Sequence, residues 1–163
     1  VTQSITGVGF QPTGLMILEA GGSISGYPAS AKGAILGLGI TDGTNQGTIE
    51  EHDADNQAIS DTANIQLTDA IQCAITSTGT NARKISISSF DADGFTTSYA
   101  SNFAEANPVV YLALSGLRIK VGNFNKSTGG APASQAVTGV GFQPTGIMFL
   151  SFQKTSSASV AFD

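Results

Sequence analysis

Charged side chains are scarce in this chain. Asp, Glu, Lys and Arg make up 12% of its 163 residues, whereas an average soluble domain carries about 25%. Only seven residues are cationic, and the net charge is −5. Binding to nucleic acid requires clustered cations that displace counterions from phosphates, and the short groups Arg83-Lys84 and Arg118–Lys120 form no such cluster. The composition therefore predicts that the protein binds neither nucleic acid nor anionic membranes.

Cysteine and histidine each occur once, as Cys73 and His52, and tryptophan is absent. A single thiol cannot form an intrachain disulfide, so the fold does not depend on disulfides. Cys73 lies among alternating apolar residues in AIQCAIT, which favours a small buried core residue over a reactive or metal-binding thiol. One Cys and one His exclude a typical zinc site, and the chain offers no nucleophile–base pair. We therefore expect that the protein is not an enzyme.

Long apolar segments are also missing. No stretch reaches the roughly 18 consecutive apolar residues that a membrane span requires, so no membrane insertion is expected. Gly, Ser, Thr, Ala and Asn replace the missing charge and give a polar, uncharged surface of the kind found on extracellular and virion proteins. The chain begins with Val1 rather than Met, as expected of a processed protein or of a segment of a longer one. We predict a virion or extracellular location.

What the sequence does contain is a duplication. The nine-residue string TGVGFQPTG occurs at Thr6–Gly14 and again at Thr138–Gly146, an offset of 132 residues. The similarity extends over Ser4–Leu18 and Ala136–Leu150, where the differing residues remain apolar at most positions. Repetition at a fixed offset indicates a structural unit of about that length. We therefore predict a module over residues 1–132 and a partial second repeat over residues 133–163.

The pattern of apolar residues indicates β-strands. Lys84–Ser88 alternates strictly, which places Ile85 and Ile87 on one face. The turn dipeptides Asp42-Gly43 and Asp93-Gly94 are strong hairpin signals. Three other runs are short and continuously apolar, as in strands that are buried on both faces in a sandwich core or under an interface: Leu15–Leu18, Ala34–Ile40 and Val109–Leu114. We predict an all-β fold, either an antiparallel β-sandwich or a jelly-roll-like barrel, with short helical turns within Ala58–Thr68 and Ser101–Ala106 as the exceptions.

The second repeat is expected to need a partner. We predict a strand over Arg118–Phe124, before the second copy, and another over Ile147–Phe152, which lacks the rest of its module. Unpaired strands are completed by other strands, so we expect a homo-oligomer in which a neighbouring chain completes the sheet. The residues that we assign to this role are corner anchors and apolar residues of the interface strand: Phe10, Pro12, Phe142, Pro144, Ile147, Phe149 and Phe152.

Two acidic clusters are candidates for a cation site. Alternating carboxylates occur at Asp91 and Asp93, and again at Asp53 and Asp55; hard cations such as Ca²⁺ prefer this type of ligand. The EF-hand pattern is absent, and a simpler interpretation is available for each cluster. Asp91 and Asp93 suit a hairpin turn because Asp bonds to nearby backbone groups, and Asp53 and Asp55 suit a solvated loop. We favour these interpretations, keep Ca²⁺ as the alternative, and predict no other cofactor.

Four strings together resemble a recurrent pattern in structural proteins of tailed phages: GVGFQPTGLMIL, SSFDADGFTTSY, VVYLALSG and VGNF. That pattern is found in β-sandwich modules of tail, fibre or capsid-decoration components. The resemblance covers most of residues 1–124 and recurs at 137–150. It implies a virion structural protein and carries no catalytic residue. Two alternatives remain open: a receptor- or glycan-binding module that contacts host-surface glycans, and a bacterial surface or filament subunit.

Overall fold

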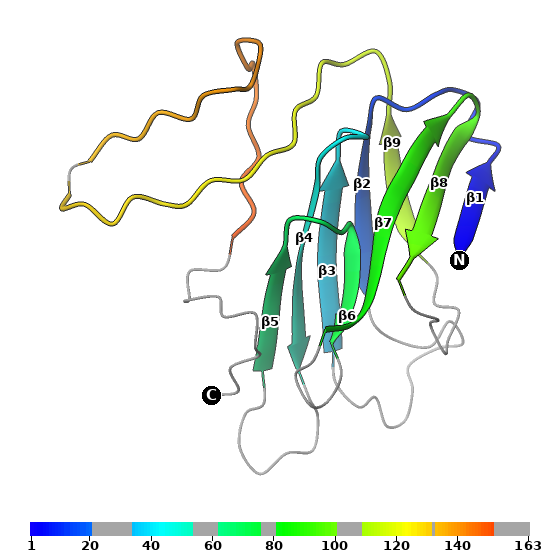
Figure 1. The fold of residues 1–163 in the computed structure, drawn as a ribbon, viewed down its shortest axis with the longest axis horizontal. Helices are drawn as coiled ribbons and strands as arrows, with labels where there is room; N and C mark the ends of the chain where they lie inside the picture. Colours follow the sequence, from blue (N-terminus) through cyan, green and yellow to red (C-terminus); the bar gives the residue numbers. More distant parts are fainter. Residues whose placement is uncertain (21–33, 54–61, 76–80, 101–108, 132, 152–163) are drawn as a thin grey trace.

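The structure of the chain is a computed structural model that describes residues 1–20, 34–53, 62–75, 81–100, 109–131 and 133–151. These residues form nine β-strands and no helix. None of the described segments is therefore a helix that could cross a membrane. The strands form two antiparallel sheets that face one another (Figure 1). The predicted all-β antiparallel sandwich is confirmed.

The two sheets have four and five strands. The smaller has the order β1 (Thr2–Thr6), β8 (Gly94–Tyr99), β7 (Asn81–Asp91) and β6 (Gln72–Ile75). The larger has the order β5 (Thr62–Leu67), β4 (Gln46–Asp53), β3 (Ala34–Thr41), β2 (Gly14–Ala20) and β9 (Val110–Leu114). The strand order contains two meanders, β2 to β5 and β6 to β8, with β1 and β9 added at the edges.

The core lies between the sheets and is mainly aliphatic, with Phe95 as its one buried aromatic residue among those described. Leu15 and Ile17 of β2 pack against Ile85 and Ile87 of β7 and Phe95 of β8, and all five side chains are at most 8% exposed. Strict alternation places these residues on the inner face of each strand. Burial of five large apolar side chains contributes about 1.5–3 kcal/mol for each. The alternation predicted for Ile85 and Ile87 is thus confirmed.

Two of the predicted hairpin turns are present. Asp42-Gly43 lies in the connection between β3 and β4, where Thr41 pairs with Gln46. The second turn joins β7 to β8, where Asp91 pairs with Gly94. Gly43 has a φ of 84°, which an L-residue with a side chain rarely adopts. The helical turn predicted within Ala58–Thr68 is wrong for residues 62–67, which form β5 because they pair with β4 along its length. The one predicted within Ser101–Ala106 lies outside the described residues.

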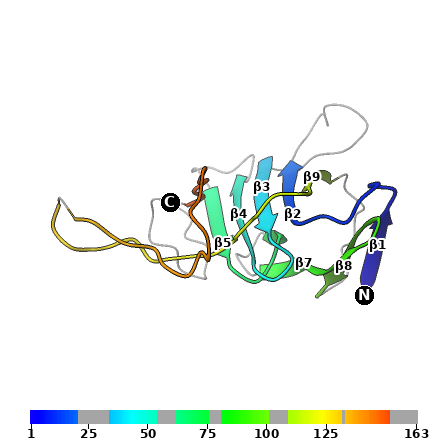
Figure 2. The same cartoon turned by 90° about the horizontal axis from the view of Figure 1, so that it is seen from above.

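Residues 115–151 extend away from the sandwich as an arm. The arm leaves β9, passes over the end of the larger sheet and projects beyond β5, on the side opposite to β1 (Figures 1 and 2). It contains no strand among its described residues, so the strands predicted over Arg118–Phe124 and residues 147–151 are wrong for this chain alone. An alternating segment becomes a strand only when a neighbouring strand supplies hydrogen bonds.

Candidate assembly surface

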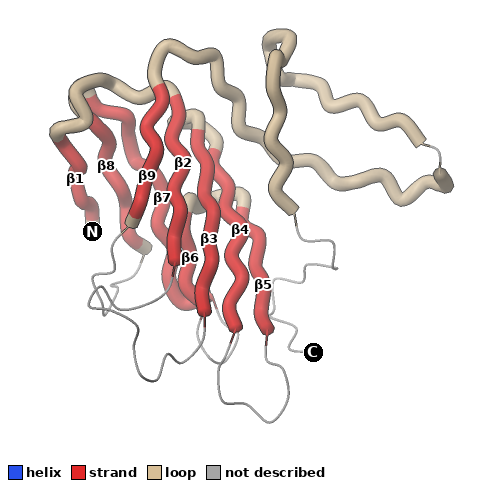
Figure 3. The backbone as a smooth tube through the Cα atoms, turned by 180° about the vertical axis from the view of Figure 1, so that it is seen from behind, coloured by secondary structure: helices blue, strands red, loops and turns tan. Residues whose placement is uncertain are grey.

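The outer side of the five-stranded sheet is apolar where β9, β2 and β3 lie side by side. Leu15 and Ile17 are buried between the sheets, so the alternating side chains of Met16 and Leu18 point outward. The same alternation applies to the neighbouring strands. We call this surface, which Figure 3 views from the outside, the outer apolar face; its members are Met16, Leu18, Leu36, Leu38, Ile40, Val110 and Leu112.

The register of the sheet makes this face continuous. Leu18 lies opposite Leu38 of β3 and opposite Val110 of β9. A second row across the same three strands consists of Leu112, Met16 and Ile40. Four members are strongly exposed: Leu18 is 49%, Leu36 60%, Val110 65% and Leu112 53% accessible. Contiguous exposed apolar patches of this kind mark interaction sites on soluble proteins.

The strand at the end of this face is unprotected. β9 is the last strand of the larger sheet, and its second edge has no strand partner among the described residues. Edge strands are commonly guarded by a lysine, an inward-pointing charge or a proline. The segment Val110–Leu114, VYLAL, contains none of these. The outer apolar face and a free strand edge therefore meet at β9.

The inner face of the same sheet contains two buried carboxyl groups. Glu19 of β2 and Glu50 of β4 both pair with Gly37 of β3 and are 7% and 1% exposed. Burial raises the pKa of Glu19, and a side-chain hydrogen bond with Gln72 opposes this effect. The Cys73 thiol donates to Oε2 of Glu50 at 3.1 Å and is fully buried. Burial and the nearby Glu50 raise the pKa of Cys73. The prediction of a buried core cysteine is confirmed.

The turn between β1 and β2 is bound by Asp93, which lies in the β7–β8 hairpin. The amides of Gly7 and Gly9 donate to the two carboxylate oxygens of Asp93 at 3.1 and 2.5 Å. The amide of Val8 donates to the main-chain oxygen of Asp93 at 3.3 Å. Both glycines have a positive φ, 84° and 86°, which directs their amides toward one carboxylate. The turn of the first copy is thus attached to the β7–β8 hairpin through Asp93.

The second copy has the same turn without these contacts. Gly139 and Gly141, which correspond to Gly7 and Gly9, have φ angles of 82° and 80°. The guanidinium of Arg118 lies 5.0 Å from the ring centroid of Phe142 and donates to the oxygen of Gly141 at 3.3 Å. The turn is therefore present in the arm, held by Arg118 instead of an aspartate.

The solvent exposure of the predicted interface residues differs between the two copies. Pro12 is buried and Phe10 is 37% exposed, whereas Pro144 is exposed and Phe142 is half-buried. Ile147 and Phe149 are each 69% exposed, while their counterparts Leu15 and Ile17 are 2% and 3% exposed. The ring of Phe149 contacts the ring of Phe124 edge-on at 5.9 Å. Phe152 lies outside the described residues.

Of the four acidic residues named as cation ligands, Asp91 and Asp93 accept hydrogen bonds from other groups of the chain. Asp91 accepts hydrogen bonds from the hydroxyls of Ser89 and Thr96 at 2.8 and 2.7 Å, and these bonds lower its pKa. Asp93 binds the turn described above. Asp53 ends β4, its side chain lies outside the description, and Asp55 lies outside the described residues. Within the described part of the chain, no group of three or more His, Cys, Asp or Glu could hold a metal ion.

Comparison with family models, curated proteins and solved structures finds no match to this chain. The outer apolar face, the free edge of β9 and the exposed second copy are therefore the features on which a function is argued. Sequence reasoning found the runs that form the face, because they are apolar at every position. It missed the role of Asp93 as an acceptor for a distant turn, and it missed the buried pair Glu19 and Glu50; an acidic residue within the apolar run of β2 was the available signal.

Proposed function

We propose that this protein is a structural module that self-associates and that forms part of a phage particle as a decoration, tail or fibre component. The observation that carries self-association is the outer apolar face. A sandwich that worked alone in water would be expected to carry polar residues on the outward positions of β2, β3 and β9. Here these positions carry Leu, Met, Ile and Val, which stabilise an interface when a second sheet covers them.

The charge distribution supports this function. The face has no charged side chain on β9, and its outward positions on β2 and β3 are apolar. The outer side of the sheet becomes polar on β4 and β5, where Glu51 of β4 and Gln66 of β5 are exposed. Interfaces between permanently associated subunits are more apolar than the rest of the surface and are depleted in charge at their centre. A catalytic role has no comparable support in the arrangement of the described side chains.

The native mass of the particle tests self-association. We expect light scattering to show a defined oligomer of the 16.5 kDa chain whose mass does not change when a calcium chelator is added. The double variant Leu18→Thr, Leu112→Thr replaces two exposed apolar side chains with polar ones, and the β-branched threonine is well suited to a strand. Its mass should fall to that of the monomer.

The matched control is Gln66→Thr, an exposed position on β5 of the same sheet, which should leave the oligomer intact. A wild-type chain that is monomeric at all concentrations would contradict the proposal. A mass that falls on chelation would assign the association to a bound cation instead of the face. The virion role is tested separately, by labelling purified tailed-phage particles with antibodies against this chain; absence from every particle would contradict it.

A further inference from the structure

The first copy of the repeat is held in a defined position in the sandwich, which we call the acceptor slot. β1 pairs with β8, the turn binds Asp93, and β2 lies between β3 and β9. Two further bonds fix the segment between turn and strand. Nε2 of Gln11 donates to the oxygen of Phe90 at 3.0 Å, and the amide of Thr13 donates to the oxygen of Leu114 at 2.7 Å.

Every residue of the first copy that makes one of these turn contacts has an identical counterpart in the arm. Gly7, Gly9, Gln11 and Thr13 correspond to residues 139, 141, 143 and 145, which are Gly, Gly, Gln and Thr. The two glycine φ angles agree between the copies to within 6°. The arm therefore presents the segment in a turn conformation that the acceptor slot already accommodates, so little backbone reorganisation is needed at the turn.

The apolar residues that enter the core also have apolar counterparts. Leu15 corresponds to Ile147, and Ile17 corresponds to Phe149. Both arm residues are 69% exposed, so their transfer into the slot buries them in place of Leu15 and Ile17, which leave it. The larger ring at the position of Ile17 requires some repacking of the core.

One difference between the copies favours the second copy as the occupant of the slot. Ser151 stands where the first copy has Glu19, a buried carboxyl whose pKa is raised by burial. With Ser151 in the slot, one of the two acids beside Gly37 is absent from the sandwich. Removal of a buried ionisable group lowers the desolvation penalty at neutral pH.

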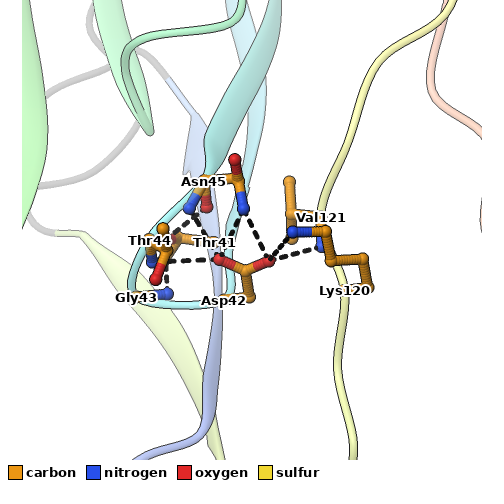
Figure 4. Close-up of polar contacts among 7 residues, drawn as sticks. All are labelled: Thr41, Asp42, Gly43, Thr44, Asn45, Lys120 and Val121. Atoms are coloured by element: carbon orange, nitrogen blue, oxygen red, sulfur yellow. Dashed lines mark hydrogen bonds and ion pairs between the residues drawn. The ribbon is translucent and has the colours of Figure 1, made fainter. Parts of the chain in front are cut away.

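The position of the arm makes a neighbouring chain the accessible acceptor. Its base is bound at the β3–β4 turn, where Oδ2 of Asp42 accepts the amide of Val121 at 2.8 Å and lies 3.9 Å from Nζ of Lys120 (Figure 4). Val121 is 7% exposed. Beyond this point the arm runs out past β5 and doubles back, so that residues 133–151 lie along residues 115–131, on the side of the sandwich opposite to β1 and β8 (Figures 1 and 2). The second copy of one chain is thus held apart from its own slot while the contacts of the arm's base are kept.

From these observations we infer that residues 136–151 bind in the acceptor slot of a second copy of this chain and replace that copy's residues 4–19. The inference rests on the proposed self-association and adds a second contact between copies, separate from the outer apolar face. Each replacement links one chain to the next, because the arm of the acceptor remains free to enter a third. The contact is of the head-to-tail type, which builds rings or open filaments.

A disulfide placed across the slot tests this exchange. The hydroxyls of Ser4 and Thr96 are 2.9 Å apart on paired residues of β1 and β8, and Ala136 corresponds to Ser4. The variant Ala136→Cys, Thr96→Cys is refolded from denaturant at several protein concentrations and then mildly oxidised. We expect disulfide-linked dimers and larger species on a non-reducing gel, increasing with concentration. The native Cys73 is fully buried and does not react in the folded chain.

Two controls separate exchange from chance contact. Ala136→Cys with Gln66→Cys places the second thiol on an exposed position of β5 and should lose the linked species. Adding Gly139→Val and Gly141→Val to the crosslinking variant removes the positive-φ turn and should also lose them. Gly130→Val in their place, at an open position of the arm with no neighbour within 4 Å of the added Cβ, should retain them.

The outcomes distinguish this inference from the proposed function. Linked dimers that require both matched cysteines support the exchange. A crosslink within a single chain overturns it, because the second copy would then occupy its own slot. An oligomer by light scattering with no crosslink also overturns it, while self-association through the outer apolar face remains. A monomer with no crosslink contradicts both.

Discussion

At the scale of single residues, Asp93 determines how the N-terminal segment is attached. One carboxylate accepts the amides of Gly7 and Gly9, residues more than 80 positions away in the chain. Hydrogen bonds to a charged group contribute about 1.5–3 kcal/mol each when they are well shielded, and less at this exposed site. We expect Asp93→Ala to lower the free energy of unfolding by about 1–3 kcal/mol, measured by urea denaturation.

Asp91→Ala is the matched control, because it lies two residues away in the same hairpin. Asp91 accepts only the hydroxyls of Ser89 and Thr96 among the described residues, and these hydroxyls can bond to water instead. Its loss should therefore change the stability much less than the loss of Asp93. Equal effects of the two substitutions would show that Asp93 does not hold the turn.

Glu19 gives the stability a pH dependence of defined sign. Its pKa is raised in the folded chain because burial disfavours the ionised form. The stabilisation associated with the neutral acid is complete below the unfolded pKa of about 4.3 and is lost as the pH rises through the folded pKa. We expect Glu19→Gln to raise the thermal midpoint relative to wild type by more at pH 7 than at pH 4. Differential scanning calorimetry at the two pH values measures this difference.

Glu51→Gln is the appropriate control, since Glu51 is exposed on the outer side of β4. Its effect should be the same at both pH values. A Glu19→Gln effect that is equally independent of pH would contradict the assignment. Glu50, Cys73 and Lys84 are the other ionisable groups of this cluster, and both variants retain them.

These residue-scale features set a limit on what the sequence predicts. The Asp91–Gly94 hairpin was predictable because Asp and Gly favour turns locally. The bonds from Asp93 to Gly7 and Gly9 were not, because they depend on how β1 is placed beside β8. The burial of Glu19 had one local signal, its position directly after the apolar run Leu15–Leu18. That signal does not distinguish a buried acid from an exposed one.

At the scale of secondary-structure elements, main-chain atoms of Ile71 lie directly against the inner face of β3 at Gly39. The Cβ of an alanine at position 39 would fall on the main-chain oxygen of Ile71, whereas at position 37 its nearest contact would be Cβ of Glu19 at 3.6 Å. We expect Gly39→Ala to destabilise the protein by about 1–3 kcal/mol or more. Gly37→Ala, an ordinary contact in the same strand, should cost much less. Chemical denaturation of both variants provides the measurement, and comparable midpoints would contradict the close approach.

The strands of the sandwich were largely predictable, and those of the arm were not. In β7, alternating Ile85 and Ile87 find a core, so the pattern and the structure agree. In the arm, Arg118–Phe124 alternates in the same way but no described strand lies beside it. Periodicity reports which face a segment prefers, whereas a ladder requires a second strand with free donors and acceptors. The sequence shows which face a segment prefers, but not whether a second strand lies beside it.

At the scale of the whole molecule, Asp42 connects the arm to the sandwich. Although its partial burial acts to raise the pKa, hydrogen bonds from Asn45, Val121 and Thr44 keep the pKa of Asp42 below its usual value. The carboxylate therefore stays ionised and bound at neutral pH. We expect Asp42→Ala to release residues 119–121, so that trypsin cleaves after Lys120 several-fold faster, as measured by mass spectrometry.

Cleavage after Lys126 is the internal control, because Lys126 is already exposed on the outer part of the arm. Its rate should be unchanged by Asp42→Ala. The variant Thr44→Ala, which alters the same turn but keeps the carboxylate, should leave both rates unchanged. Faster cleavage at both lysines in Asp42→Ala would indicate general unfolding instead of release of the arm.

The duplicated turn has a consequence for how the fold is encoded. Residues 4–18 supply β1 and β2 ahead of β3, and residues 136–150 repeat their sequence after β9. In the exchange inferred above, residues 34–151 supply the nine strands in a rotated order, with β3 to β9 first and the second copy of the β1–β2 segment last. The chain therefore holds two overlapping orders of one set of strands, related to each other as circular permutants. Both orders share β3 to β9, and they differ in whether the first or the second copy of the repeat completes the sandwich.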